Sequence, residues 1–302
     1  MDNGTYMVDK IQVFIIADYG RGDPAFVEVD QYISAFVPGA AAKYISVEPF
    51  STTHTGFWTY QIAVNDMDIR GSKSRGAKTR TYIYTNTAPR RDNKNPRMNN
   101  EGEPLAYAKL STGLEIVGVL SGESFSYIKP MIKEIRLIRI PPEKGKEQFR
   151  SRRIFTAALG RIVSGDYSCL GEKVKLGSIP EPRRSRIAHV DSYGNIKLTS
   201  RASDLHGLKA GDRVAVSIGD RRIVMRYTGG VFSVSEGEFS LAPGSSGANE
   251  NRFLEIMMRL GNAWEAFGCP RVESEVSFGK AHSPATLPNT RRFGGWTGEH
   301  AK

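Results

Sequence analysis

The chain has 302 residues and a formal net charge of +10, with 39% hydrophobic and 25% charged residues. This composition excludes a disordered or fibrous protein, and the length suffices for two domains with separate cores. No stretch approaches the roughly 18 apolar residues of a membrane-spanning helix, and the opening MDNGTYMVDK lacks the pattern of a secretion signal. The two cysteines, Cys169 and Cys269, have no metal-ligand spacing, so we expect a reduced, cytoplasmic compartment and no metal.

The positive charge is concentrated in short runs. Basic residues flank the segment 79–85 on both sides, and further clusters lie at 150–153 and 182–186. Such runs can follow the phosphates of a nucleic acid. However, no aromatic residues alternate with them, as base-stacking platforms would require. The sequence therefore favours a solvated basic surface, and a nucleic-acid partner stays open as the alternative.

The first part of the chain alternates apolar runs with helical patterns. IQVFIIA (11–17) predicts a strand buried on both faces, and hence a parallel, central one. Asp23 is the expected N-cap and Pro24 the first residue of a helix, which Pro-Gly at 38–39 ends. A second strand, a second helix and a third strand are expected at 42–50, 53–64 and 79–85. This order predicts a mainly parallel sheet with helices on its faces.

The middle of the chain begins with a segment rich in Asn, Arg, Pro and Gly. Residues 86–113 therefore predict a long loop, which in a compact domain is usually functional or disordered. Two further strands are expected at 114–120 and 134–140, and a helix at 152–163. Prolines and charged residues at 177–186 indicate a linker.

The last part has a different character. Short strand-like segments, broken by Gly-Asp and Gly-Gly turns, lie at 186–190, 195–199, 213–218, 221–227 and 231–235. SIGDRR (217–222) predicts a tight hairpin, and NRFLEIMMRLGNAWEAFG (251–268) resembles a helix that Gly268 closes. The segment from Arg271 is polar and without periodicity. The pattern predicts a small antiparallel β-barrel or sandwich followed by a mobile tail.

The expected fold is thus an α/β N-terminal domain with a mainly parallel sheet and a small C-terminal antiparallel β-barrel domain. The expected boundaries are an N-terminal tail at 1–10, the α/β domain at 11–176, the linker at 177–186, the barrel at 187–269 and the tail at 270–302.

The loop after the first predicted strand, ADYGRGDPAF (17–26), carries more polar residues than a turn needs. In a parallel sheet, such loops form the ligand crevice. The Asp18 carboxylate can accept two hydrogen bonds from a vicinal diol such as a ribose, and Gly20 and Gly22 let the backbone pass close to a ligand. Asp23 and the helix start after it offer N–H groups to an anion. A ligand-free capping turn is the alternative, and the G-x-G-x-x-G pattern of dinucleotide-binding proteins is absent.

A second polar corner, HVDSYGNIKLT (189–199), joins two predicted strands. Its Asp, Ser, Gly and Asn residues are all turn formers, so an ordinary β-turn is one interpretation. The other is functional, because the Asn195 amide can both donate to and accept from the edge of a base.

Three segments together resemble a known family. IIADYGRGDPAFVEVDQYI, VDSYGNIKLT and NENRFLEIMMRLGNAWEAFG are similar to segments of the S-adenosylmethionine hydroxide adenosyltransferases and of their relatives, the fluorinases and chlorinases. Order and spacing agree over residues 11–268. The resemblance implies a homotrimer in which S-adenosyl-L-methionine, the substrate, lies between the N-terminal domain of one subunit and the C-terminal domain of its neighbour.

The resemblance also implies roles for individual residues. Asp18 would hold the ribose hydroxyls, and Asp23 would lie near the methionine end. Ser151, in QFRSRRIF, would stand near the nucleophile. Asp191 and Asn195 would contact the amino-acid ammonium and the adenine. The remaining expected substrate contacts are His54, Tyr193, Asn251, Phe253 and Met258.

The chain departs from the family in its catalytic loops. The hydrolysing members carry V-D-P-G-V-G-x-x-R-R where this chain has YTNTAPRRDNKN, so Asn86 or Thr87 replaces an aspartate. Their P-D-N-G is here LSGES (120–124), and their H-G-R-D is RSRR, so Arg150 replaces a histidine. His54 stands where the family has an aromatic residue and is a candidate to compensate.

The reaction that the resemblance implies needs few catalytic groups. Attack on the 5′ carbon of a sulfonium expels a neutral thioether, so the leaving group needs no acid, and no metal or cofactor is expected. A positive charge would lower the pKa of an attacking water. The candidates for that charge are Arg90, Arg91 and Arg150.

The resemblance therefore implies an S-adenosylmethionine hydrolase that forms adenosine and L-methionine, with Asp18, Asn86 and Ser151 as its catalytic group. Two alternatives stay open beside the nucleic-acid partner. One is an adenosyl-binding protein without catalysis, and the other is an adenosyltransferase that uses another nucleophile.

Overall fold

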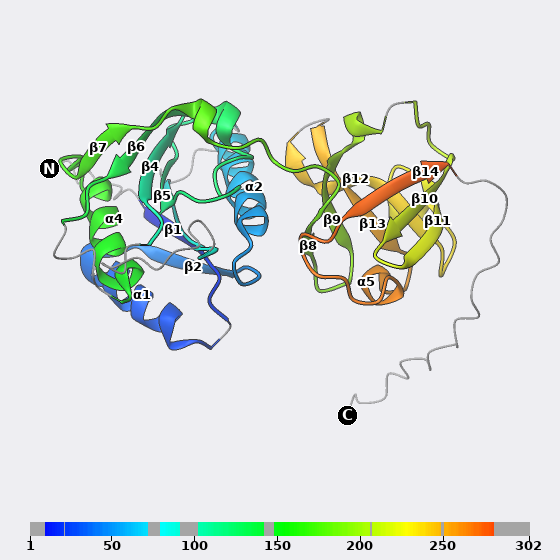
Figure 1. The fold of residues 1–302 in the computed structure, drawn as a ribbon, viewed down its shortest axis with the longest axis horizontal. Helices are drawn as coiled ribbons and strands as arrows, with labels where there is room; N and C mark the ends of the chain where they lie inside the picture. The colour runs from blue at the N-terminus through cyan, green and yellow to red at the C-terminus, as the bar shows by residue number, and fades with distance from the viewer. Residues whose placement is uncertain are drawn as a thin grey trace, which may run out of the picture.

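A computed structural model describes residues 10–20, 22–71, 79–90, 102–141, 148–205, 207–248 and 251–280. Within these ranges the chain forms two β-sheets of seven strands each and four α-helices (Figure 1). The fold is therefore mostly β, and the expectation of a mainly parallel α/β domain with an antiparallel barrel is wrong. No helix in the described ranges is long and apolar enough to cross a membrane.

The first sheet is mixed. Its strands are β1 (Lys10–Ala17), β2 (Ala41–Ser46), β3 (Thr79–Asn86), β4 (Leu105–Leu110), β5 (Glu115–Val119), β6 (Ile132–Ile138) and β7 (Leu170–Lys173). They lie in the order β2-β1-β3-β5-β4-β6-β7. The pairs from β2 to β5 are parallel and those from β5 to β7 antiparallel. Strand β4 lies inside the expected loop 86–113 and pairs with β5 as a hairpin, which makes half of the sheet antiparallel.

Helices cover both faces of the parallel part of this sheet. Helices α1 (Pro24–Phe36) and α4 (Thr156–Val163) pack on one face, where α1 contributes the buried Val29 and Ile33. Helix α2 (Thr52–Gly71) packs on the other face, beside Ile16 of β1. Strand β1 is therefore parallel and buried on both faces, as its apolar run predicts.

The second sheet is a half-barrel. Its strands are β8 (Ile187–Val190), β9 (Ile196–Arg201), β10 (Arg213–Ile218), β11 (Arg221–Tyr227), β12 (Phe239–Ala248), β13 (Asn251–Met258) and β14 (Val276–Lys280). The order is β14-β10-β11-β12-β13-β9-β8. Only the described pair β11–β12 is parallel. A bridge between Arg186 and Glu275 connects the two edges at one end.

Three expectations for this half have different outcomes. The SIGDRR hairpin is confirmed: Ile218 pairs with Arg221 across a two-residue turn in which Gly219 has φ 59°. The helix expected at 251–268 is wrong, because its first eight residues form β13 and only Ala263–Ala266 is helical (α5). Strand β14 lies within the expected mobile tail at 270–302, and residues beyond 280 lie outside the described ranges, as does most of the expected N-terminal tail.

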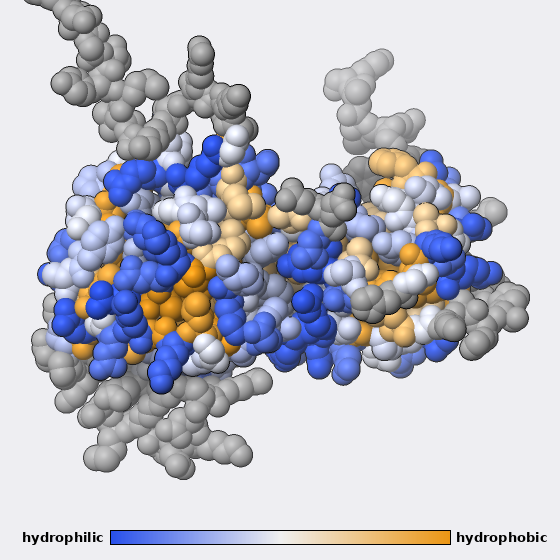
Figure 2. Space-filling view, turned by 90° about the horizontal axis from the view of Figure 1, so that it is seen from above, coloured by the Kyte–Doolittle hydropathy of each residue, from blue (hydrophilic) through white to orange (hydrophobic). Residues whose placement is uncertain are grey.

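The space-filling view shows how apolar side chains are distributed on one side of the molecule. On the half that carries the first sheet, an orange hydrophobic area is framed by hydrophilic residues (Figure 2). The half that carries the second sheet shows smaller orange areas in the same view.

The two halves meet along α2. One buried cluster there contains residues of both halves: the rings of Phe57, Tyr127 and Phe253 and the methyl group of Ala188. Next to it, Arg183 of the segment between the sheets pairs with Glu123 from the first half and with Glu273 from the second, the latter at 2.8 Å. Arg183 also donates to Thr53 Oγ1 at 3.0 Å. This network ties the segment between the sheets to both halves.

We expect Arg183→Ala to lower the free energy of unfolding by about 2–3 kcal/mol, because Glu123, only 4% exposed, would lose its cation. Arg184→Ala is the matched control: the two arginines are similarly exposed, 48% and 52%, but the partner of Arg184, Asp204, is 32% exposed, so the expected loss is about 0–1 kcal/mol. Urea unfolding measures both values. Equal losses in the two variants would contradict the role of this network.

Candidate functional site

The carboxyl ends of β1 and β3 lie side by side, and polar residues stand at both. Asp18 follows β1, Asn86 ends β3, and the Asp18 N–H donates to the Asn86 carbonyl at 3.3 Å. Ser151 comes from another part of the chain and begins a π-helical turn at Ser151–Phe155 that leads into α4. Such turns are rare and occur frequently at functional sites. The structure thus brings Asp18, Asn86 and Ser151 to one end of the sheet.

Tyr19 connects these residues. Its hydroxyl accepts from Asn86 Nδ2 at 2.6 Å and lies 2.8 Å from Ser151 Oγ. Either hydroxyl can donate in the second bond, and Tyr19 has its own proton available for it because Asn86 supplies the proton of the first bond. Burial raises the pKa of the Tyr19 phenol, so it stays protonated and keeps this role at neutral pH. Tyr84 completes the cluster by donating to the Ser151 carbonyl at 2.8 Å.

The Asp18 carboxylate is half-buried beside this cluster. Its Oδ2 accepts from the Phe50 N–H at 3.0 Å. Burial raises the pKa of Asp18 above its usual value, while the Phe50 N–H and the charge of Arg90 oppose that rise. A carboxylate in this position can accept hydrogen bonds from ligand hydroxyls with the lone pairs that Phe50 leaves free.

The backbone around Asp18 is strained. Phe50 has φ 65° and Arg90 has φ 56°, values that non-glycine residues rarely adopt. The Arg90 guanidinium lies 5.7 Å from the centre of the Phe50 ring, and the Arg90 N–H donates to the buried Glu103 at 2.9 Å. Two strained residues in contact, one of them bonded to Asp18, are typical of a functional site.

The sequence offers further candidates: Arg150 and Arg91 for the positive charge, and Thr87 for the missing aspartate. Arg150 stacks over the Phe155 ring at 5.5 Å, and Arg91 lies outside the described residues. Thr87 is 1% exposed and bonds Thr55 Oγ1 at 2.7 Å, so Asn86 is the residue of this pair that belongs to the cluster.

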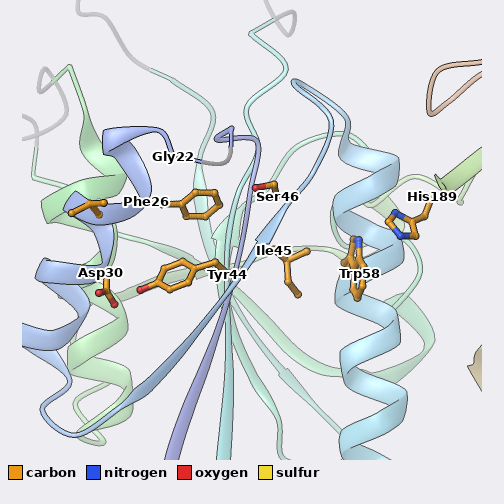
Figure 3. Close-up of a pocket in the computed structure, with 9 residues that line it drawn as sticks. Gly22, Phe26, Asp30, Tyr44, Ile45, Ser46, Trp58 and His189 are labelled. Carbon is orange, nitrogen blue, oxygen red and sulfur yellow. The ribbon is translucent and has the colours of Figure 1, made fainter. Parts of the chain in front are cut away.

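A groove of about 610 Å³ lies next to the loop after β1 (Figure 3). Phe26 connects the groove to the cluster, because its ring lies 5.1 Å from the ring of Tyr19 and 5.4 Å from that of Tyr44. Trp58 of α2 and His189 of the second half form the opposite wall. The groove therefore has aromatic side chains on both sides of the edge strand β2.

Asp23 stabilises the loop at the end of this groove. It precedes α1 as the N-cap and Pro24 follows it, as the sequence predicts. Its side chain does not cap the helix, however; Oδ2 accepts from the Gly20 N–H at 2.5 Å. Asp23 thus shapes the loop that holds Asp18 and Tyr19.

His54 lies at the seam between the two halves and is 6% exposed. Its Nδ1 accepts from the Glu48 N–H at 3.1 Å, and its Nε2 lies 2.9 Å from His189 Nδ1. Trp58 Nε1 also donates to His54 Nε2 at 3.2 Å, and among the described residues no hydrogen bond joins His54 to the Tyr19 cluster.

At the corner between β8 and β9, the Asp191 side chain forms hydrogen bonds within the turn. Asp191 Oδ1 accepts from the N–H groups of Tyr193 and Asn195, both at 3.0 Å, and Oδ2 accepts from Asn195 Nδ2 at 3.1 Å. These bonds describe an Asx-type turn, in agreement with the turn interpretation. Tyr193 is 77% exposed at its tip.

The three residues expected from β13 do not form one pocket within the chain. Asn251 and Met258 are the first and last residues of the strand, about 23 Å apart along an extended chain. Phe253 is 1% exposed in the ring cluster of the seam.

Comparisons with known proteins establish the fold alone. Two solved structures are similar over 88% of this chain and 99% of their own length. One is an uncharacterized conserved protein from Thermotoga maritima, with a TM-score of 0.66 and 18% identity. The other is a conserved hypothetical protein from Thermus thermophilus, with a TM-score of 0.58 and 18% identity. No protein-family model and no curated protein matches the chain.

Proposed function

We propose that the chain binds S-adenosyl-L-methionine at the Tyr19 cluster and hydrolyses it to adenosine and L-methionine. The observation that supports this proposal most directly is the hydrogen-bonded group of Tyr19, Asn86 and Ser151 beside the half-buried Asp18. The resemblance to the adenosyltransferase family nominates three of these residues, and they meet although Ser151 is 132 positions from Tyr19.

In this reaction Asp18 holds the ribose hydroxyls and so fixes the 5′ carbon. A water oxygen forms a bond to that carbon, the carbon–sulfur bond breaks, and its electron pair stays on sulfur. Methionine leaves as a neutral thioether, and the water proton is released to solvent. When Tyr19 donates to it, the Ser151 hydroxyl has its own proton available for a bond to the attacking water. Alignment rather than acid–base strength supplies the rate in such a displacement.

The proposal requires a second subunit. None of Asp191, Tyr193 and Asn195 is among the described residues that line the groove next to the loop after β1, and neither Asp18 nor the Tyr19 cluster lines it. The exposed tip of the β8–β9 corner, with Tyr193 at 77% exposure, is suited to close the groove of a neighbouring chain. We therefore propose a homotrimer in which the site is completed between subunits.

A binder without turnover, or an adenosyltransferase with another nucleophile, is the second candidate. Asn86 Nδ2 and Ser151 Oγ are already bonded to Tyr19, and neither residue is ionisable. Such a cluster can bind a nucleoside without activating a water.

Incubation of the purified full chain with S-adenosylmethionine, followed by chromatography of the products, tests the proposal. We expect equal amounts of adenosine and methionine, and an at least tenfold lower rate for Asp18→Asn, about the loss of one charge-assisted hydrogen bond. Asp220→Asn, at the exposed tip of the β10–β11 hairpin, is the matched control and keeps the full rate. Calorimetric binding without product would favour the second candidate, and absence of both would contradict the two together.

A further inference from the structure

A second cavity, of about 380 Å³, lies at the seam between the two halves. Its walls come from α2, from η1 (Lys129–Met131), from the segment between the sheets and from β9, β12 and β13. Tyr60, Met67, Tyr127 and Met131 supply its apolar surface. It shares no described lining residue with the groove next to the loop after β1. The cavity is therefore separate from that groove, although Asn251, one of the expected substrate contacts, lies in its wall.

Arg201 of β9 is the charged group at the base of this cavity. It is 8% exposed, and its guanidinium lies 5.0 Å from the centre of the Tyr60 ring and 4.1 Å from that of Phe253. Nη1 donates to the Asn251 carbonyl. The two rings and this bond hold the guanidinium in one orientation, so binding an anion there costs little side-chain entropy.

The other charges around the cavity are paired. Glu181 pairs with Lys129, and Arg184 pairs with Asp204 at 3.2 Å. Within the described part of the chain, no carboxylate lies at ion-pair distance from the Arg201 guanidinium. The cavity thus contains one positive charge without an anionic partner from these residues. A buried charge is costly unless it is paired, so this arrangement favours a bound anion.

We propose that this cavity binds a small aromatic monocarboxylate, with the carboxylate on Arg201 and the ring against the apolar walls. A single negative charge matches the single uncompensated cation, and the guanidinium can donate two parallel hydrogen bonds to a carboxylate. Tyrosine rings offer stacking surfaces, and the two methionines adapt to a flat ring. The volume lies at the lower end of the range for small-molecule sites, about 300–1,000 Å³.

The test uses benzoate and its neutral isostere benzamide with the full chain, followed by saturation-transfer NMR. We expect saturable binding of benzoate and an affinity for benzamide at least about tenfold weaker, which is the value of a charge-assisted hydrogen bond. Arg201→Gln is expected to abolish the difference between the two compounds. Arg221→Gln, in the exposed β10–β11 hairpin and outside the lining of the cavity, is the matched control and keeps it.

A second variant keeps the test decisive if Arg201→Gln does not fold. Met67 lies on the open side of the cavity and is 39% exposed, so Met67→Trp fills the cavity with little effect on the core. We expect this variant to lose benzoate binding while its melting temperature stays within a few degrees of the wild type. Equal affinities for benzoate and benzamide, no saturable binding of benzoate, or benzoate binding that Met67→Trp leaves unchanged would each overturn the proposal.

Discussion

Phe253→Ala is expected to lower the free energy of unfolding by about 3–5 kcal/mol. The ring is 1% exposed and lies 5.3 Å from the ring of Phe57, 5.6 Å from that of Tyr60 and 6.0 Å from that of Tyr127. Its removal leaves a cavity between the two halves, because these rings come from elements that cannot all move inward. It also removes one of the two rings that hold the Arg201 guanidinium.

Phe232→Ala is the matched control, because this phenylalanine is 87% exposed and its loss should change the stability by about 0.5 kcal/mol or less. Urea unfolding of both variants measures the difference. If Phe253 lined a base pocket, as the family resemblance implies, its alanine variant would lose substrate affinity while its stability remained close to that of the control. That outcome would contradict the packing described here.

The apolar runs of β1 and β13 show which patterns in the sequence identify a strand and which do not. The run IQVFIIA predicts β1 correctly because a strand covered on both faces needs apolar residues at every position. The run in β13 is similar but resembles a helix in sequence: Leu254 and Ile256 face the core of the half-barrel while Phe253 faces the seam. A strand buried on both faces has no alternation, so its pattern does not distinguish it from a buried helix.

Strand β4 escapes prediction for another reason. Its six residues follow a segment of Asn, Arg and Pro, and such a short apolar run gives little periodicity to detect. The omission changes the fold class, because β4 is the strand that makes half of the first sheet antiparallel.

The candidate site is partly predictable. Asp18 follows from its place after a parallel strand, whereas Asn86 and Ser151 come from the family resemblance alone. Tyr19 is not singled out by the sequence, although it directly follows Asp18, because a tyrosine beside a strand end is as often a core residue. No local pattern could have indicated that His54 meets His189, since 135 positions separate them.

That histidine pair predicts a loss of stability in mild acid. Burial is the main cause that lowers the pKa of His54 to about 3 and that of His189 to about 4. His189 adds to the shift of His54, and Lys197 lowers the pKa of His189 further while Asp191 opposes it. Both rings are therefore neutral in the folded protein at neutral pH, and one of the two facing nitrogens, 2.9 Å apart, carries no proton and accepts from the other.

Within the described residues, a further proton on His54 or His189 would have no hydrogen-bond acceptor at the nitrogen that it occupies. The Glu48 N–H occupies Nδ1 of His54, and Nε2 of the same ring faces Nδ1 of His189. Protonation of either ring therefore places two donors face to face, between the rings or against the Glu48 amide. Glu255 forms an ion pair with Lys197 at 2.9 Å. Asp191 lies 4.0 Å from Lys197, and its negative charge favours a proton on His189, which offsets part of the cost of protonation.

The direction of the pH effect on stability follows from the lowered pKa values of the two histidines. In the unfolded chain both histidines bind protons below about pH 6.5, whereas in the folded protein they stay neutral until about pH 4. The unfolded state thus binds up to two more protons in this window, and stability falls as the pH falls through it. The expected slope is up to about 2.7 kcal/mol per pH unit between pH 6 and 5, or about 1.4 for each histidine.

Urea unfolding at closely spaced pH values between 6.4 and roughly 5.2 measures this slope, in a range that lies above most carboxyl titrations. In the double variant His54→Gln, His189→Gln the two groups that titrate are gone, so we expect its stability to be almost independent of pH there. The amides can still form one hydrogen bond across the seam, which keeps the variant folded at neutral pH. If the wild type and the double variant showed the same slope, the protons that destabilise the protein in acid would bind elsewhere, and the neutral histidine pair would not be the acid-sensitive contact between the two halves.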